Sequence, residues 1–153
     1  MADARTALHA VIRPGVFGRE TADPGVVLSE RRGLALTGFA PGVVAGALRD
    51  TLGIAVDSRP NRASAGGETL ALWLGPERYL VLSPAGRRPA ASALLGQALT
   101  PDRAGIVQLD HARTIVRLSG RNARDVLAKG CLIDIHPSAL PAGACAQTAL
   151  FHI

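Results

Sequence analysis

A short pattern of residues occurs twice in this chain of 153 residues. In each copy an apolar run ends in Leu-Thr-Gly or Leu-Ser-Gly, at residues 36–38 and 118–120, and a segment with helical spacing follows. A glycine suited to ending that helix comes next, Gly53 in one copy and Gly130 in the other, and then an apolar run that reaches an aspartate. Two strand–helix–strand units of this kind predict an α+β fold made of two similar halves.

The first half is expected to hold most of the strands. Short apolar runs bounded by glycine, proline and polar residues are typical of strands, and Pro41 and Gly53 suit the two ends of a helix. These signals predict strands over residues 34–39, 54–58, 69–74 and 79–83, helices over 41–52 and 90–99, a polar loop over 59–68, and a hairpin turn at Gly75-Pro76.

The second half has fewer elements. Strands are expected over residues 105–109, 114–120 and 148–153, and a short helix over 122–129. Residues 1–32 are rich in Gly, Pro, Arg and Asp, and they are expected to form an N-terminal arm with an edge strand at 26–28. The rest, 33–153, is expected to be a single α+β domain with halves at about 33–100 and 104–153.

Composition limits the class of protein. Hydrophobic residues make up 48% of the chain, which is enough to bury a core. No apolar run is long enough to cross a membrane, and no N-terminal signal for secretion precedes the domain, so the cytoplasm is the expected location. The two cysteines, Cys131 and Cys145, are expected to be reduced thiols rather than a disulfide.

The charge of the chain is +5, and sixteen of its seventeen basic residues are arginines. Guanidinium groups pair with carboxylates and phosphates, so such a surface suits an anionic partner. Nucleic-acid binders usually cluster their basic residues and add aromatic side chains for base stacking, whereas here the arginines are scattered and aromatics are few. A solvated or protein-facing basic surface is therefore favoured over a nucleic-acid interface.

No complete catalytic or metal-binding set is predicted. Asp110, His111 and Ser119 resemble a hydrolase triad in composition, but adjacent residues on a strand point to opposite faces, and no nucleophile elbow surrounds the serine. The four potential zinc ligands, Cys131, His136, Cys145 and His152, are separated by four, eight and six residues, whereas structural zinc sites use tight pairs.

Phosphate-binding signals are weak as well. No Gly-rich loop lies between a strand and the start of a helix, and the predicted loop that contains Gly66-Gly67 is not followed by a helix. Arg87-Arg88 is expected to be a solvated pair. The chain is therefore expected to carry no catalytic residue and no metal, and no cofactor-binding residue is identified.

Trp73 and Tyr79 flank the predicted hairpin turn. Tryptophan, tyrosine and arginine are enriched among the residues that dominate protein interfaces, but plain core packing explains the two aromatics equally well. Together with Arg113 and Arg117, they form the candidate partner interface.

Three stretches of the chain, taken in order, resemble one known family. They are WLGPERYLVLSP at residues 73–84, LDHARTIVRLSGRNARDVLAKGCLIDIHP at 109–137, and PAGACAQTALFHI at 141–153. They are similar to the W-L-G-P-x-x-x-L, L-S-G-x-x-A-x-x-x-L-x-K-G-C-x-x-D-x-H-P and G-x-C-A-Q-T stretches of the gamma subunit of heterotetrameric sarcosine oxidase. The resemblance covers residues 70–153 well and the first seventy residues only by general pattern.

The resemblance implies a fold and a setting. The fold would be similar to the folate-binding domains of aminomethyltransferases, and the partners would be alpha, beta and delta subunits. That complex demethylates sarcosine oxidatively to glycine, forming hydrogen peroxide and formaldehyde or methylene-tetrahydrofolate. FAD, FMN, NAD, tetrahydrofolate and zinc would belong to the partner subunits, and this chain would be a non-catalytic accessory.

Two features depart from the family pattern. Arg121 stands where relatives often have proline, which removes a preset helix-start geometry. Relatives also continue past the TALFHI segment into a further strand and a C-terminal helix that this sequence lacks. An alternative function is a stand-alone folate-binding or aminomethyl-transfer domain, for which Asp57, Asp110 or Asp134 would have to hold the pterin.

Overall fold

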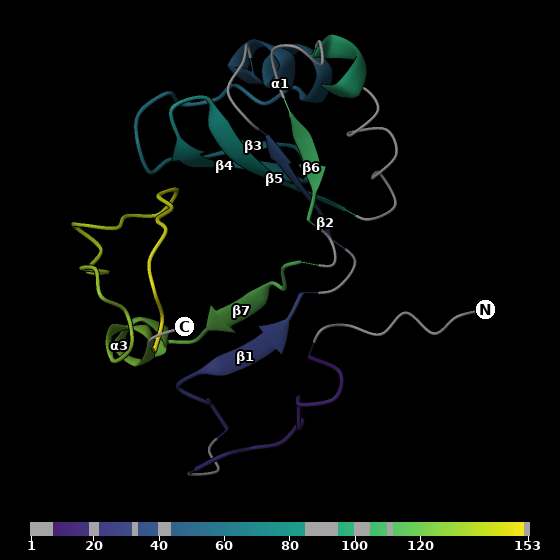
Figure 1. Cartoon of the computed structure of the whole chain (residues 1–153). Coiled ribbons are helices and arrows are strands. Elements are labelled where there is room, and N and C mark those ends of the chain that lie inside the picture. The colour runs from purple at the N-terminus through teal and green to yellow at the C-terminus, as the bar shows by residue number, and fades with distance from the viewer. Residues whose placement is uncertain are drawn as a thin grey trace. The chain divides into compact units, whose positions relative to one another are not determined.

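A computed structural model describes the chain in two compact units (Figure 1). The described residues are 8–18, 22–31, 34–39, 44–84, 95–99, 105–109 and 112–151. Unit 1 consists of Met1–Arg32, His111–His136 and Thr148–Ile153, and unit 2 of Gly33–Asp110 and Pro137–Gln147. The mixed α+β class expected from the sequence is confirmed, and each unit is described by itself below.

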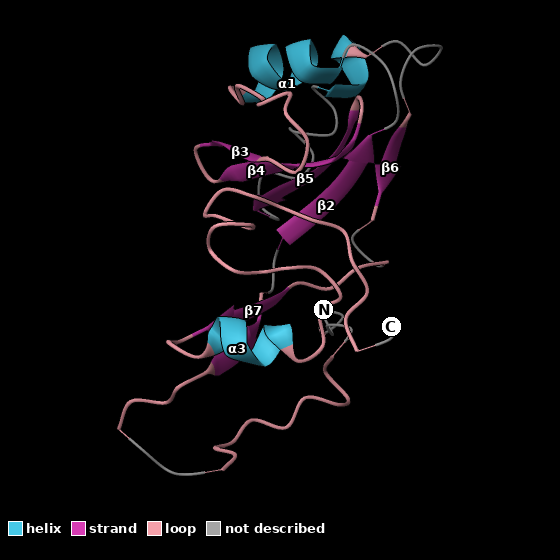
Figure 2. Cartoon of the chain, turned by 90° about the vertical axis from the view of Figure 1, so that its left-hand side faces the viewer, coloured by secondary structure: helices cyan, strands magenta, loops and turns pink. Residues whose placement is uncertain are grey.

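Unit 2 is built on a five-stranded antiparallel sheet. Its strands lie in the order β3-β4-β5-β2-β6. They are β2 (Leu34–Phe39), β3 (Ala63–Gly66), β4 (Thr69–Gly75), β5 (Arg78–Pro84) and β6 (Ile106–Gln108). Helix α1 (Val44–Leu52) lies over one face of this sheet, as Figure 2 shows.

The core of unit 2 lies between that face and the helical segments. Alternate residues of β4 and β5 point inward, because successive side chains on a strand face opposite sides of the sheet. The buried cluster comprises Ala47, Leu48, Ile54, Ala71, Tyr79, Val81, Leu95 and Leu99. Leu95 and Leu99 come from a second helical segment, whose residues 95–98 confirm part of the helix expected over 90–99. Residues 90–94 lie outside the described residues.

Helix α1 ends as expected at Gly53, but the chain beyond it is not a strand. Gly53 has a φ of +66°, its N–H donates to the carbonyl of Arg49 at 3.0 Å, and the N–H of Ile54 donates to that of Leu48 at 3.2 Å. The strand expected over 54–58 is wrong, since these residues join no sheet. The alternation there reflects burial: Ile54 is fully buried and Val56 packs against the core.

The loop expected over 59–68 is also partly wrong, because it contains strand β3. The strand pairs with β4 through a tight turn, with Gly66 opposite Thr69 and Gly67 at a φ of +59°. Its small residues allow close packing: a Cβ on Gly66 would lie 2.8 Å from Cγ1 of Ile54. The hairpin turn expected at Gly75-Pro76 is confirmed by the pairing of β4 with β5.

The segment 137–147 belongs to unit 2 and lies along the start of β3. The N–H of Ala63 donates to the carbonyl of Gly143 at 2.9 Å, and the N–H of Cys145 donates to that of Asn61 at 2.9 Å. These bonds satisfy backbone groups at the outer edge of the sheet, where an unpaired strand would otherwise be exposed.

Unit 1 contains a two-stranded antiparallel ribbon and one short helix. Strand β1 (Val27–Glu30) pairs with β7 (Val116–Ser119), so the edge strand expected in the N-terminal arm pairs with a strand about ninety residues later. Helix α3 (Ala123–Ala128) follows β7, within the range expected for it. Residues 148–151, the described part of the strand expected at 148–153, form only an isolated bridge between Leu150 and Cys131.

The two copies of the repeated pattern share a further local structure. After the helix-stopping glycine, Oδ1 of Asp57 accepts a hydrogen bond from the N–H of Arg59 at 3.0 Å. In the second copy, Oδ1 of Asp134 accepts from the N–H of His136 at 2.8 Å. Both aspartates therefore form the Asx turn in which the side chain bonds to the backbone two residues on. A proline follows each turn.

Candidate interaction surface

The two units differ sharply in how much apolar surface they bury. Ile135 is the one buried residue among the described residues of unit 1, whereas the buried cluster of unit 2 has eight members. Ten of the twelve exposed large hydrophobic side chains of the described chain belong to unit 1. They are Val11, Val16, Phe17, Val27, Leu28, Val116, Val126, Leu132, Ile133 and Phe151. The exposed apolar side chains of the described residues are therefore concentrated in unit 1, which the sequence did not predict.

The β1–β7 ribbon has one polar and one apolar face. The register places Leu28 opposite Leu118 and Glu30 opposite Val116, so these four side chains share a face. Leu28 is 60% exposed and Val116 is 44% exposed, although three of the four residues on that face are apolar. The other face carries Val27, Ser29, Arg117 and Ser119. The signal in the sequence was the alternation in VRLS, which predicts that one face of β7 is apolar but not that this face stays exposed.

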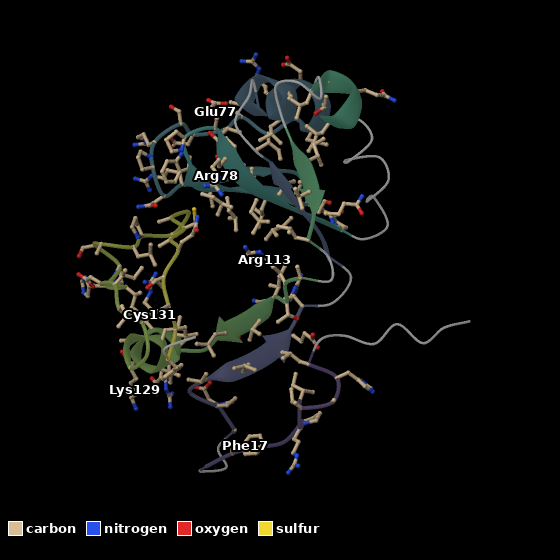
Figure 3. All side chains as sticks on the ribbon, viewed as in Figure 1. Phe17, Glu77, Arg78, Arg113, Lys129 and Cys131 are labelled. Atoms are coloured by element: carbon tan, nitrogen blue, oxygen red, sulfur yellow. The ribbon has the colours of Figure 1, made fainter. Side chains whose placement is uncertain are left out.

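A second group of exposed apolar side chains surrounds the end of α3. The ring of Phe151 lies against Gly130, and Leu132 is 72% exposed in the loop that follows. Lys129 and Cys131, which are labelled in Figure 3, lie just after the last residue of the helix in the chain. Helix α3 itself has no buried residue.

The excess positive charge is concentrated in unit 1. Its sequence holds ten basic and six acidic residues, a net charge of +4, against seven and six in unit 2, a net charge of +1. Arg113 and Arg117, two of the predicted interface residues, are exposed and form no ion pair with any described residue. Figure 3 shows Arg113 on the segment that leads into β7.

The other two predicted interface residues lie in unit 2. Tyr79 is 3% exposed in the core, and its burial raises the pKa of its hydroxyl. Trp73 packs against the same cluster. Their positions favour the core-packing alternative for both aromatics, whereas Arg113 and Arg117 are on the surface of unit 1.

The structure describes only some of the residues that were considered for a hydrolase triad or for phosphate binding. Asp110, His111, Arg87 and Arg88 lie outside the described residues. Ser119 is the last residue of β7 and pairs with Val27. Gly66-Gly67 forms the β3–β4 turn rather than a loop before a helix.

The potential zinc ligands are not brought together where the structure describes them. Among the described residues no group of three or more His, Cys, Asp or Glu side chains is arranged to hold a metal. Cys131 belongs to unit 1 and Cys145 to unit 2, and both are free thiols. His152 lies outside the described residues.

Cys145 has a local structural role instead. Its Sγ donates to the carbonyl of Arg62 at 3.3 Å and lies 3.5 Å from that of Trp73. Burial raises the pKa of this thiol. The side chain thus helps to hold segment 137–147 against the sheet.

The carboxylates considered for a pterin are engaged by their own loops. Nε and Nη2 of Arg59 donate to Asp57, with Nη2 2.7 Å from Oδ2, and these bonds lower the pKa of Asp57 to about 2. Asp134 forms its Asx turn, and Asp110 lies outside the described residues. No helix in the described part of the chain is both long and apolar enough to cross a membrane.

Comparison with known proteins identifies the family. The model of the sarcosine oxidase, gamma subunit family matches residues 37–152. The chain belongs to this family. Its curated relatives include sarcosine oxidase subunit gamma of Corynebacterium sp. (strain P-1), 36% identical over 85 residues, which are 56% of this chain and 41% of that protein. The subunit gamma of an Arthrobacter species is 32% identical over 111 residues, 70% of this chain and 52% of the relative.

Two solved structures are similar to this gamma-family chain. A chain of heterotetrameric sarcosine oxidase from Corynebacterium sp. U-96, in complex with pyrrole 2-carboxylate, superposes with a TM-score of 0.72 at 27% identity, covering 82% of this chain and 65% of that one. Glycine cleavage system aminomethyltransferase T from Bartonella henselae gives a TM-score of 0.55 at 19% identity, covering 70% of this chain and 32% of that one. The second likeness shows a shared fold. The chain spans about half the length of the curated relatives it matches.

Proposed function

We propose that this chain acts as the non-catalytic gamma subunit of a heterotetrameric sarcosine oxidase-like flavoenzyme, in the cytoplasm, where it assembles or stabilises the larger subunits. The observation that carries the proposal is the family match over residues 37–152, which the likeness to a chain of a heterotetrameric sarcosine oxidase supports. In this proposal the complex converts sarcosine to glycine, peroxide and formaldehyde or methylene-tetrahydrofolate.

The cofactors of the reaction are assigned to partner chains in this proposal. FAD, FMN, NAD, tetrahydrofolate and zinc would lie on the alpha, beta and delta subunits. The two described carboxylates considered for a pterin are already bound within their loops, which supports placing folate elsewhere. The exposed apolar and basic surface of unit 1 supports a role in contacts between chains.

The test is co-expression of this chain with the cognate flavoprotein subunits, followed by size-exclusion chromatography monitored at flavin wavelengths. Co-elution in fixed stoichiometry, with loss of the complex or of its activity when this chain is omitted, is the expected result. A fully assembled and active flavoprotein that elutes apart from this chain contradicts the proposal.

The second candidate is a stand-alone folate-binding or aminomethyl-transfer domain, favoured by the likeness in fold to aminomethyltransferase T. It requires the isolated chain to bind tetrahydrofolate. Calorimetric titration separates the two functions, because the subunit proposal expects no saturable binding by the chain alone.

We also propose that the chain contains two similar halves. Support comes from the repeated order of strand, helix, glycine, Asx turn and proline, seen around Gly53 and around Gly130. The element after each helix is a turn rather than the strand that the sequence pattern predicted.

A further inference from the structure

A short strand precedes each copy of the repeated pattern. Strand β1 comes before β2, separated from it by residues 31–33, and β6 comes before β7, separated from it by residues 109–115. The repeated tripeptides, Leu-Thr-Gly at 36–38 and Leu-Ser-Gly at 118–120, lie within β2 and at the end of β7. β1 and β6 therefore hold the same place in the repeat, and we call them the leading strands.

The leading strands pair across the two halves rather than within them. β1 pairs antiparallel with β7, and β6 pairs antiparallel with β2, as Figure 1 shows. In the described part of the chain neither leading strand pairs with the strand that follows it. The first half thus supplies β1 to the sheet of unit 1, and the second half supplies β6 to the sheet of unit 2.

The two crossed pairings use the same register. Thr37 lies opposite Gln108, and Ser119, which is the counterpart of Thr37 in the repeated tripeptide, lies opposite Val27. A slip by one residue would turn every side chain of a strand to the other face, so the register is a specific property of each pairing. Agreement at the level of single residues indicates one arrangement that occurs twice.

The sequence also allows a leading strand to fold back on its neighbour. Residues 31–33, Arg-Arg-Gly, would connect β1 to β2, and a three-residue connection that ends in glycine is typical of a hairpin. Such a hairpin, kept in the common register, would place Glu30 opposite Leu34. In the structure Arg31 instead extends the pairing with β7, because its N–H donates to the carbonyl of Ile115 at 2.8 Å.

Contacts beyond the strands favour the crossed pairing of β1. The N–H of Asn122 donates to the carbonyl of Gly25 at 2.9 Å. Nη1 of Arg121 lies 2.8 Å from Oδ2 of Asp23. These residues lie just before β1 and just after β7, so both contacts would be lost if β1 paired with β2. The ion pair is exposed, and we expect the backbone hydrogen bond to contribute more.

We propose that the two halves exchange their leading strands, so that each half completes the sheet of the other and the two are interlocked. Exchange of an identical element between two copies of a protein is known as domain swapping, and here it takes place between two similar halves of one chain. The inference deepens the proposal of two similar halves and extends the first half back to include β1. It does not depend on the role of the chain as a subunit.

Four equivalent positions distinguish exchanged strands from hairpins. Opposite residues of an antiparallel pair have Cα atoms about 4.5–5.5 Å apart, a distance that a disulfide can span. The exchanged pairs are Val27→Cys/Ser119→Cys and Thr37→Cys/Gln108→Cys. The matched control pairs, Val27→Cys/Thr37→Cys and Gln108→Cys/Ser119→Cys, use the same positions but combine residues that lie in different units. Each variant of the full chain is oxidised under mild conditions while it is folded.

Tryptic mapping without reduction identifies the links. The four positions fall in different tryptic peptides, 20–31, 33–49, 104–113 and 118–121, so mass spectrometry assigns each disulfide to one pair. We expect the two exchanged pairs to form at least about tenfold faster than the two control pairs, because a disulfide requires residues that already lie close together. The native thiols of Cys131 and Cys145 are mapped as well, to detect misplaced links.

The stability of the linked chain is a second, independent measurement. A disulfide that fits the native pairing should raise the urea midpoint of the oxidised chain above that of its reduced form, because the link restricts the unfolded chain. Both exchanged pairs should show this rise, and neither control pair should.

Three results overturn the exchange. Faster linking of the control pairs would favour two hairpins. Links between positions 27 and 119 that appear only in disulfide-joined dimers on non-reducing electrophoresis would place the exchange between two chains instead of within one. Equal rates in all four variants, or no link in any of them, would contradict the common register. None of these results bears on the proposed subunit function, which is tested separately by co-elution with the flavoprotein subunits.

Discussion

The ring of Phe151 occupies the space where a side chain on Gly130 would lie. A Cβ on Gly130 would come within 2.6 Å of Cδ1 and Cε1 of that ring, and the N–H of Phe151 donates to the carbonyl of Gly130 at 3.0 Å. Gly130 was expected from the sequence as a helix stop, but it is not among the glycines with a positive φ. Glycine is therefore needed at position 130 because a side chain there would clash with the Phe151 ring, and not because of the backbone conformation.

Replacing Gly130 with alanine should displace the Phe151 ring and loosen the segment that carries it. We expect the amide of Phe151 to lose protection from hydrogen exchange, and the free energy of unfolding to fall by about 1 kcal/mol, as for an average destabilising substitution. Mass-spectrometric hydrogen exchange and urea titration measure the two effects.

Gly96→Ala is the control for that substitution. Gly96 lies in the helical residues 95–98, and the nearest atom to the position that its methyl group would take is Cδ1 of Ile106 at 4.0 Å. Alanine there should leave stability unchanged or raise it by about 0.5–1 kcal/mol, because alanine is the better helix former. Equal effects of Gly96→Ala and Gly130→Ala contradict the role assigned to the ring.

Asp57 should link stability to pH in the acid range. Arg59 lowers the pKa of Asp57 from 3.8 to about 2 through side-chain and backbone hydrogen bonds. A pKa lowered by folding gives a stabilisation that is present above pH 3.8 and is lost as the pH falls toward 2. Asp57→Asn should remove this part of the pH dependence, as measured by urea unfolding between those limits.

Arg59→Gln tests the cause of the shift. The substitution removes the guanidinium bonds but keeps the backbone N–H bond, so the pKa of Asp57 should move part of the way back to 3.8. Nuclear magnetic resonance titration of the Asp57 side-chain carboxyl follows the change. A pKa that stays at about 2 in the variant contradicts the assignment to Arg59.

The spacing of apolar residues in the sequence predicted an element correctly where the apolar run also pairs with a neighbouring strand. Strand β2 at Leu34–Phe39 and the β4–β5 hairpin at Gly75-Pro76 are examples, because an apolar run and a turn signal coincide there. The apolar spacing predicted a strand wrongly where residues are buried but do not pair with another strand. Ile54 and Val56 alternate like a strand, yet they pair with no strand, and the Asx turn of Asp57 follows them directly.

Small residues explain the strand that was missed. Strand β3 has the sequence ASAG, which lacks the β-branched and aromatic residues that mark a strand, and its pairing depends on the turn at Gly67. The Gly66-Gly67 dipeptide was the available hairpin signal. The exposure of the apolar face of the β1–β7 ribbon was not predicted, because an apolar strand face in a sequence is ordinarily assigned to a core.

The thiol of Cys145 should react slowly. Burial raises its pKa, so less of the reactive thiolate is present at neutral pH. In a Cys131→Ser variant, which leaves Cys145 as the only thiol, alkylation by iodoacetamide at about pH 8 should be slower than that of free glutathione and should speed up as the pH rises. Reaction as fast as that of glutathione contradicts the burial of this side chain.

Removing the Cys145 thiol should loosen the segment beside β3. Cys145→Ala loses the contacts of Sγ with the carbonyls of Arg62 and Trp73, for an expected cost of about 1 kcal/mol. Hydrogen exchange should rise at the amide of Ala63, which donates to Gly143 in the same segment. Cys131→Ala, in the other unit, should leave the exchange of this amide unchanged.

Gly120 joins the ribbon to helix α3 at a point where two backbone segments nearly touch. A Cβ on Gly120 would lie 2.5 Å from the carbonyl oxygen of Gly25, and its φ is +107°. That oxygen accepts a hydrogen bond from the N–H of Asn122 at 2.9 Å. An alanine at this position should force the backbones apart and weaken the end of the β1–β7 ladder.

Gly18→Ala separates the two causes of this effect. Gly18 also has a positive φ, +88°, but no atom of the described residues lies within 4 Å of its Cβ position. We expect a loss of about 1 kcal/mol for Gly18→Ala from backbone strain alone, and of more than about 2 kcal/mol for Gly120→Ala, where strain and steric overlap combine. Urea unfolding and exchange at the Asn122 amide provide the comparison. Similar losses in the two variants would show that the close approach to Gly25 contributes nothing.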